Sequence, residues 1–181
     1  MNITISGNLG SGKSTICKIL EQKGFNVVTA GGIFRQIAKE RGIDVVELMS
    51  LQDDSVDELL DTRNEELGQK LDHTVFDSRM AWYFVPDAMK VFVRVDIETA
   101  AKRIFNDATR DTEHNDSLEE CRNNIIRRQG LERDRYRSLY GQDIYDLNNY
   151  DVIIDGASGT PEELADIILT EYGKKSKKAA G

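Results

Sequence analysis

The chain has 181 residues, of which 39% are hydrophobic and 31% are charged, and its formal net charge is -8. This length and composition are those of one soluble globular domain with a proper core, and they exclude a disordered chain. The negative charge argues against a general nucleic-acid binder, which carries a broad basic face, and no apolar run approaches the roughly 20 residues of a membrane span.

The first predicted strand, at about residues 2–6, leads into a glycine-rich segment, GNLGSGKS, and then into a helix at about residues 13–23. We call residues 7–14 the phosphate loop, because glycine, four residues and then Gly-Lys-Ser between a strand and a helix is a triphosphate-binding pattern. The glycines let backbone N–H groups face a polyphosphate, Lys13 reaches the β- and γ-phosphates, and the Ser14 hydroxyl can ligate magnesium. The expected nucleotide-binding residues are Gly7, Asn8, Leu9, Gly10, Ser11, Gly12, Lys13, Ser14 and Thr15.

Apolar periodicity predicts alternating strands and helices in the rest of the chain. Strands are expected at 25–29, 74–76, 90–95 and 152–154, helices at 33–41, 45–49, 55–71, 98–105, 118–139 and 161–172, and a polar loop at 106–117. This alternation predicts an α/β protein with the three-layer α/β/α P-loop NTPase fold and a five-stranded parallel sheet. We expect one domain over residues 1–172, with acceptor-binding helices at about 31–71, a helical lid at about 106–137, and a basic, disordered tail at 173–181.

Ligands bind beyond the carboxyl ends of the strands in such a sheet, and charged residues follow several of these ends. Asp77, after the third strand, either holds magnesium through water or caps a loop. Arg79 either contacts an anionic substrate through its planar guanidinium or forms a surface ion pair. Arg35 follows a Gly-Gly turn, where the backbone can approach a ligand closely, and we expect it to clamp an acceptor phosphate.

Six arginines lie between Arg122 and Arg137 in the long predicted helix. Arg128, Glu132 and Arg135 lie at i, i+4 and i+7, on one face of that helix. Such a face is either a solvated surface with salt bridges or a lid that delivers arginines to a transferring phosphoryl group. The polar loop that precedes the helix, beside a triphosphate site, favours the lid.

The order of several segments resembles the cytidylate kinases, and most closely their compact archaeal-type branch. The segments are the phosphate loop, Gly31-Gly32-Ile33-Phe34-Arg35, Asp77-Ser78-Arg79, the arginine-rich stretch 128–136, Leu139-Tyr140-Gly141-Gln142-Asp143-Ile144 and Tyr150-Asp151-Val152-Ile153-Ile154. The resemblance extends from residue 1 to about residue 170. It implies the nucleoside monophosphate kinase fold, with ATP as donor, Mg²⁺ as cofactor and CMP or dCMP as acceptor.

The resemblance also implies roles for individual residues. Arg35 and Arg79 would hold the acceptor nucleotide, together with Gly31, Phe34 and Asp77. Arg103, Arg128 and Arg135 would act on the phosphates from the lid side and are the expected catalytic residues beside Lys13. Asp143 would stand near the acceptor base or sugar, and Ser14 and Asp77 would hold the metal.

The sequence departs from the pattern of this family at two places. Ser78 stands where the family usually has a glycine, and Arg103 is followed at four residues by Asp107, where the archaeal branch often has a second arginine. Arg110 is the nearest replacement. These differences bear on which base the acceptor carries more than on the phosphoryl transfer itself. The aromatic segment 80–85 is expected to pack in the core.

Two other functions fit the phosphate loop. A small-metabolite kinase would phosphorylate a hydroxyl with Asp77 as base, and paired acceptor-side arginines disfavour it. A nucleotide-binding regulatory module without kinase turnover would not need arginines on a lid. We expect small-molecule nucleotides as partners, no nucleic acid, no membrane and a monomer or small homo-oligomer. A cytoplasmic location is expected because the first strand leaves no room for a signal peptide.

Overall fold

The computed structural model describes residues 1–44, 48, 54–107 and 115–179. Apart from Leu48, the short helix expected at 45–49 lies outside the described residues, as do Arg110 and most of the loop 106–117.

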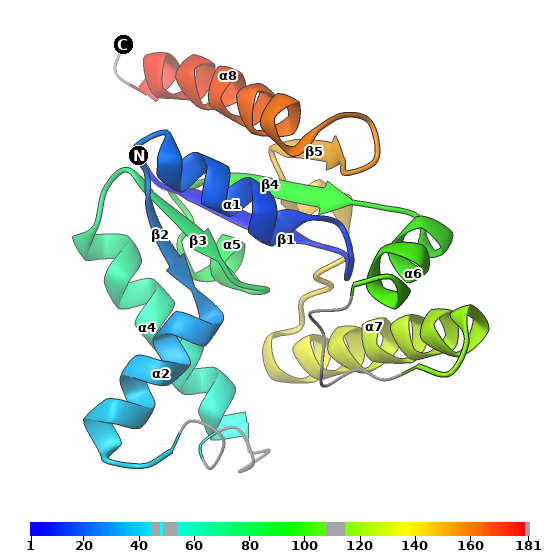
Figure 1. Ribbon diagram of the computed structural model, residues 1–181. Coiled ribbons are helices and arrows are strands. Elements are labelled where there is room, and N and C mark those ends of the chain that lie inside the picture. Colours follow the sequence, from blue (N-terminus) through cyan, green and yellow to red (C-terminus); the bar gives the residue numbers. More distant parts are fainter. Residues whose placement is uncertain (45–47, 49–53, 108–114, 180–181) are drawn as a thin grey trace.

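Five parallel strands form the central sheet in the order β2-β3-β1-β4-β5 (Figure 1). The strands are β1 (Ile3–Gly7), β2 (Asn26–Thr29), β3 (Thr74–Asp77), β4 (Met89–Arg94) and β5 (Val152–Asp155). In this register Thr29 lies opposite Asp77, and Gly7 lies opposite Val93. Because all five strands are parallel, their carboxyl ends, which carry the phosphate loop and Asp77, meet at one edge of the sheet.

Side chains alternate between the two faces of each strand, so the sheet is covered on both sides. On one face, Val91 and Val93 pack against α1 (Lys13–Gln22) and α8 (Pro161–Ala179). On the other face, Phe92 packs against α5 (Ala81–Phe84), the end of α7 (Leu118–Tyr140) and the segment that contains η1 (Leu147–Asn149). This is the predicted three-layer α/β/α fold.

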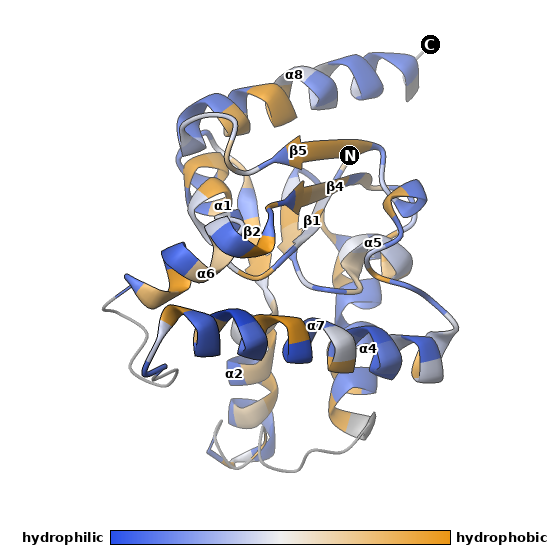
Figure 2. Ribbon diagram, turned by 90° about the vertical axis from the view of Figure 1, so that its right-hand side faces the viewer, coloured by the Kyte–Doolittle hydropathy of each residue, from blue (hydrophilic) through white to orange (hydrophobic). Residues whose placement is uncertain are grey.

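The remaining helices flank the carboxyl edge of the sheet, and the last turn of α4 reaches back to Asn2, just before β1. Helices α2 (Ala30–Arg41) and α4 (Asp54–Lys70) pack on each other and extend away from β2 and β3, whereas α6 (Ile97–Phe105) packs on α7 (Figure 1). In Figure 2, β4 and β5 are mostly hydrophobic and α7 is mostly hydrophilic. The carboxyl edge of the sheet therefore lies between two helical pairs, α2–α4 and α6–α7.

Two helix boundaries differ from the sequence-based expectation by three residues or more. Helix α2 begins at Ala30 instead of residue 33, because the Thr29 side chain accepts a hydrogen bond from the Gly32 N–H (2.9 Å) and caps the helix earlier. Helix α8 continues to Ala179, so the prediction that a disordered tail begins at residue 173 is wrong for the described residues. Lys175 pairs with Asp151 at 2.5 Å, which ties this last part of the helix to the residue before β5.

Most of the aromatic segment at 80–85 packs in the core, as expected, but Tyr83 is exposed. Met80, Ala81 and Trp82 are buried, and they form the start of α5, a short helix that the sequence pattern did not reveal. None of the described helices is long and apolar enough to cross a membrane.

Ile168 and Ile167 of α8 form a matched pair for testing the core. Ile168 is 0% exposed in the cluster between α8 and the sheet, whereas Ile167 is 46% exposed. We expect Ile168→Ala to lower the free energy of unfolding by about 2–5 kcal/mol and Ile167→Ala to change it by less than about 1 kcal/mol. Urea unfolding of both variants checks this, and equal losses would contradict the packing of α8.

Candidate functional site

The phosphate loop joins β1 to α1 and leaves the helix N-terminus open. Gly10 and Gly12 have φ angles of 72° and 91°, a region that favours glycine. Gly12 is the N-cap of α1, and no described side chain caps this end of the helix. The first N–H groups of α1 are therefore available to an anion, and the helix dipole favours a negative charge there.

The phosphate loop is packed between three neighbouring backbones. A Cβ on Gly7 would collide with the carbonyl oxygen of Val93 in β4, and a Cβ on Gly10 would lie 3.0 Å from the Cα of Ala100 in α6. From the third side, a Cβ on Gly156 would collide with the Ser11 carbonyl oxygen. These contacts set the loop conformation, and they leave no room for a side chain at Gly7, Gly10 or Gly156.

Arg103 of α6 connects two of these neighbours to the phosphate loop. Its guanidinium donates to the carbonyl oxygens of Gly10 (3.2 Å), Ser11 (3.4 Å) and Gly156 (2.8 Å). These contacts hold the loop against the turn after β5. Arg103 was expected to act on phosphates, and the structure adds that it fixes the loop backbone itself.

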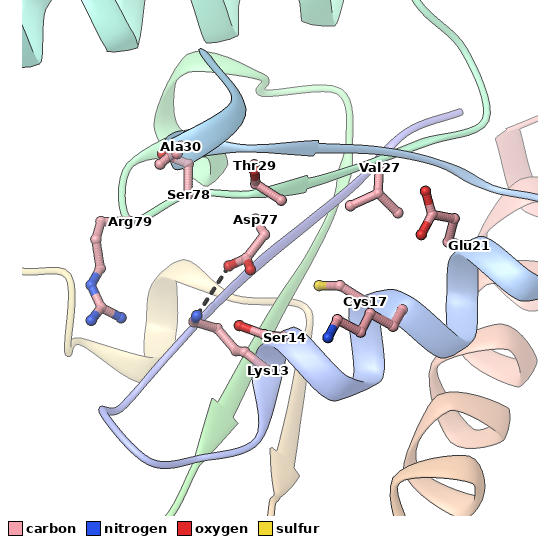
Figure 3. Close-up of a pocket in the computed structure, with 12 residues that line it drawn as sticks. Lys13, Ser14, Cys17, Glu21, Val27, Thr29, Ala30, Asp77, Ser78 and Arg79 are labelled. Atoms are coloured by element: carbon pink, nitrogen blue, oxygen red, sulfur yellow. Dashed lines mark ion pairs between the residues drawn. The ribbon is translucent and has the colours of Figure 1, made fainter. Parts of the chain in front are cut away.

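Two cavities adjoin at the phosphate loop. The first, of about 560 Å³, is the Asp77 cavity, and Figure 3 shows Lys13, Ser14, Thr29, Ala30, Asp77 and Arg79 around it. The second, of about 600 Å³, is the Arg103 cavity, which is lined by the phosphate loop, Arg79, Arg103 and Asp107. Lys13, Ser14, Lys18 and Arg79 line both cavities. Two ligands could therefore meet at these side chains.

Lys13 and Asp77 form an ion pair at the junction of the cavities. The Nζ atom of Lys13 lies 3.0 Å from Oδ1 of Asp77, and their side chains are only 18% and 12% exposed. The Ser14 hydroxyl lines the same cavity (Figure 3). Hydroxyl and carboxylate oxygens are ligands that suit Mg²⁺, which usually completes its shell with phosphate oxygens and water. The described part of the chain has no group of three or more His, Cys, Asp or Glu side chains that could hold a metal, at this site or at another.

Arg79 links the phosphate loop to α7. One guanidinium nitrogen donates to the Gly7 carbonyl oxygen (2.5 Å), and the other lies 3.4 Å from Oε1 of Glu132. The second carboxylate oxygen of Glu132 accepts from the Tyr145 hydroxyl (2.8 Å). Arg79 is therefore oriented from both sides, at the place where the two cavities adjoin.

The other expected substrate residues lie further out. Arg35 is exposed and lies beside Gly31, which lines the Asp77 cavity, whereas Phe34 packs in the apolar cluster of α2 and α4. Asp143 pairs with Arg133 (3.2 Å) and Arg137 (2.7 Å). Burial alone would raise the pKa of Asp143, but the Tyr145 N–H and the two arginines hold that pKa below its ordinary value.

The lid arginines lie on α7, as expected, but outside both cavities. Arg135 forms an ion pair with Asp57 of α4, and Arg128 is not among the described residues that line either cavity. The structure thus gathers Lys13, Ser14, Gly31, Asp77, Arg79 and Arg103, and it leaves Arg35, Phe34, Arg128, Arg135 and Asp143 beyond the cavity walls.

Sequence reasoning missed a polar stripe on α4, formed by Asp57, which is half-buried, and by Asp61 and Asn64, which are buried. Asp61 is 3% exposed and accepts a hydrogen bond from the Tyr140 hydroxyl (2.7 Å), and Asn64 is 0% exposed and donates to the Ser78 hydroxyl (3.3 Å). Burial raises the pKa of Asp61 to about 6, although the hydrogen bond from Tyr140 opposes this rise. The spacing i, i+4 and i+7 within a predicted helix was the signal for this stripe.

Comparison with known proteins gives a family for most of the chain. The model of the cytidylate kinase-like family matches residues 2–158. A curated cytidylate kinase from Sulfolobus acidocaldarius is 37% identical, and the alignment covers 99% of this chain and 98% of that protein. A curated cytidylate kinase from Archaeoglobus fulgidus is 34% identical, with 98% of each chain covered.

Solved structures with little sequence identity share the fold. An uncharacterised protein from Eubacterium ventriosum has a TM-score of 0.71 at 15% identity, covering 94% of this chain and 97% of that chain. Shikimate kinase from Bacteroides thetaiotaomicron has a TM-score of 0.66 at 16% identity, covering 96% of this chain and 98% of that chain. At these identities the likeness establishes the fold and no more.

The raised pKa of Asp61 predicts a pH-dependent stability. Between the unfolded pKa of about 4 and the folded pKa of about 6, the folded state binds more protons, so the free energy of unfolding falls as pH rises through this window. Asp61→Asn keeps an oxygen for Tyr140 and removes the buried charge. We expect it to be more stable than the wild type at pH 7.5, by on the order of 2 kcal/mol, and to show no gain at pH 4.

Urea unfolding at both pH values measures this difference. Glu65→Gln, which removes an exposed carboxylate from the same helix, is the control and should change little at either pH. An Asp61→Asn variant with the same gain at pH 4 and pH 7.5 would contradict the assigned protonation.

Proposed function

Because the chain belongs to the cytidylate kinase-like family, we propose that it transfers the γ-phosphoryl group of ATP to CMP or dCMP. The observation that carries this proposal is the pair of cavities, about 560 and 600 Å³ in volume, that share Lys13, Ser14 and Arg79. A donor in the Arg103 cavity and an acceptor in the Asp77 cavity would bring their phosphates together at these three side chains. Two nucleotide sites with a shared cationic wall are what a phosphate-to-phosphate transfer requires.

The donor half is the phosphate loop. Its backbone N–H groups and the N-terminus of α1 would hold the β- and γ-phosphates of ATP, and Lys13 would neutralise charge on the transferring group. Release of Asp77 by Lys13 would leave a carboxylate beside the Ser14 hydroxyl. These two residues would hold Mg²⁺ together with phosphate oxygens and water. When bound, Mg²⁺ would neutralise phosphate charge and orient the β- and γ-phosphates.

The acceptor half is the Asp77 cavity, with Arg79 at its junction and Arg35 beside its rim at Gly31. Both guanidinium groups can hold a phosphate through paired hydrogen bonds. The acceptor phosphate has a second pKa near about 6 and is mostly dianionic at neutral pH. It can therefore attack the γ-phosphorus in line without a general base, so Asp77 is free for the metal.

Arg128 and Arg135 are the arginines that α7 would bring to the phosphates as a lid. Arg135 is 41% exposed and paired with Asp57, so a modest movement of its side chain or of α7 would free it. Phosphates at the junction would offer it a more highly charged partner than one carboxylate. Closure of α7 with its arginines would neutralise charge in the transition state and exclude water. Arg103 would contribute from α6 while it holds the loop backbone.

A hydroxyl acceptor is the second candidate, because shikimate kinases share the fold. That likeness supports the fold alone, whereas the curated relatives that match nearly the full length are cytidylate kinases. We therefore favour the nucleotide acceptor. We further propose that the protein acts in the cytoplasm, because its substrates ATP and CMP are found there. It would act as a monomer or small homo-oligomer, and its reaction needs no nucleic acid.

An acceptor panel tests the proposed function. ADP release from ATP and Mg²⁺ is measured with CMP, dCMP, UMP, AMP, GMP and shikimate, each added alone. We expect stimulation by CMP and dCMP above all others, with CDP or dCDP formed in equal amount to ADP. Stimulation by shikimate alone, or by none of the acceptors, would contradict the proposal.

Variants of the two halves should differ in which kinetic constant changes. Lys13→Ala removes charge neutralisation at the transferring group, so we expect kcat to fall by about 100-fold or more. Arg35→Ala removes a contact to the acceptor phosphate, so we expect KM for CMP to rise by about tenfold with KM for ATP unchanged. Arg41→Ala, at the exposed end of the same helix, is the control for Arg35. Near-normal turnover of Lys13→Ala would exclude the assignment.

A further inference from the structure

The polar stripe of α4 carries three groups with hydrogen-bond acceptor atoms, namely two carboxylates and one amide oxygen. Asp57, Asp61 and Asn64 lie at i, i+4 and i+7 and share one face of the helix. Asp57 faces Arg135, Asp61 faces Tyr140, and Asn64 faces Ser78. Carboxylates and hydrogen-bonded amides are costly to bury, so three in a row between α4, α7 and the turn after β3 require an explanation.

The Oδ1 atom of Asn64 is a buried acceptor with an unused hydrogen-bonding capacity. This atom is buried, and the described residues give it no hydrogen-bond partner, although the side chain is 0% exposed. An unsatisfied amide oxygen costs stability unless a ligand or water supplies a donor. Tyr140 supplies one hydrogen bond to Asp61, whose carboxylate can accept several. The stripe therefore has unused capacity for donors at the Asp61 carboxylate and at the Asn64 amide oxygen.

The stripe begins where the Asp77 cavity ends. Ser78 lines that cavity between Asp77 and Arg79, and its hydroxyl contacts the Nδ2 atom of Asn64. The Ser6 hydroxyl of β1 donates to the carbonyl oxygen of Ser78 (3.1 Å) and fixes this turn. A nucleotide whose phosphate lies at Arg79 would extend past Ser78 toward the stripe.

We propose that Asp61 and Asn64 read the base of the acceptor nucleotide and select cytosine over uracil. This inference rests on the proposed function and names the residues that make it specific. The N4 amino group of cytosine carries two N–H donors, which match a carboxylate oxygen and the free amide oxygen. Uracil has the O4 acceptor at that position, and this oxygen would face the Asp61 carboxylate with no proton between them.

Aromatic rings beside the stripe suit a flat pyrimidine. The ring of Tyr140 stacks with those of Tyr136 and Tyr83, at centroid distances of 6.4 and 6.2 Å. Tyr140 is only partly buried, and Arg135 is 41% exposed, so both can turn outward to admit a base. A base that contacts the stripe would replace Tyr140 at Asp61 and loosen Arg135 from Asp57. Base recognition would then release a lid arginine toward the phosphates.

Binding of CMP and UMP without ATP tests this inference independently of turnover. Calorimetric titration of the wild type should show CMP bound at least tenfold more tightly than UMP. Asp61→Asn replaces an acceptor oxygen by an NH₂ donor, so we expect the ratio of the CMP and UMP affinities to fall at least tenfold. Glu65→Gln, on the same helix, should keep the wild-type ratio.

Asn64 has its own matched pair of variants. Asn64→Asp keeps an oxygen acceptor and should keep the preference for CMP, whereas Asn64→Leu has a similar size and no acceptor and should lose most of it. Thermal unfolding shows which variants are folded, and the affinity ratio of a folded variant does not depend on its stability.

The outcomes separate the two proposals. A folded Asp61→Asn that prefers CMP as strongly as the wild type would overturn the inference about the base, as would a wild type that binds CMP and UMP equally. A wild type that prefers CMP but forms no CDP would instead contradict the proposed function and leave the base-reading role in place.

Discussion

The packing of the phosphate loop against three backbones is the constraint on which the rest of the site depends. Gly7 lies against β4, Gly10 lies against α6, and Gly156 of the turn after β5 lies against Ser11. Arg103 adds hydrogen bonds from α6 to the loop and to the turn after β5. The loop can therefore present its N–H groups in one orientation before any phosphate binds, which is the preorganisation that electrostatic catalysis needs.

The cations that phosphoryl transfer needs are held by acidic partners. The pairs are Lys13–Asp77, Arg79–Glu132 and Arg135–Asp57. The first two pairs keep a cation at the junction of the two cavities, and the third holds Arg135 on α7, outside them. Phosphates carry more charge than one carboxylate and would compete for the same cations. The Arg135–Asp57 pair also connects α7 to the α4 stripe, so the proposed base recognition and the proposed lid movement would share one contact.

Local patterns in the sequence predicted much of the fold and the place of the phosphate loop within it. Strand ends, the phosphate loop and Asp77 follow from periodicity and from the rule that ligands bind at the carboxyl edge of a parallel sheet. The helix at 55–71 was predicted, but its buried stripe was not, because Asp61 and Asn64 become meaningful only beside Tyr140 and Ser78. The basic residues after 173 predict a disordered tail because the pairing of Lys175 with Asp151, 24 residues earlier, is not visible in a local pattern.

A linked bisubstrate analogue tests most directly whether one molecule of this protein holds a donor and a cytidine acceptor end to end. The compound joins adenosine and cytidine through five phosphates, and its binding is compared with that of ATP and CMP by calorimetry. The account predicts that it binds at least 100-fold more tightly than CMP and competes with both nucleotides, since it would fill both cavities across Lys13 and Arg79. Binding no tighter than that of ATP, with competition against ATP alone, would contradict the account.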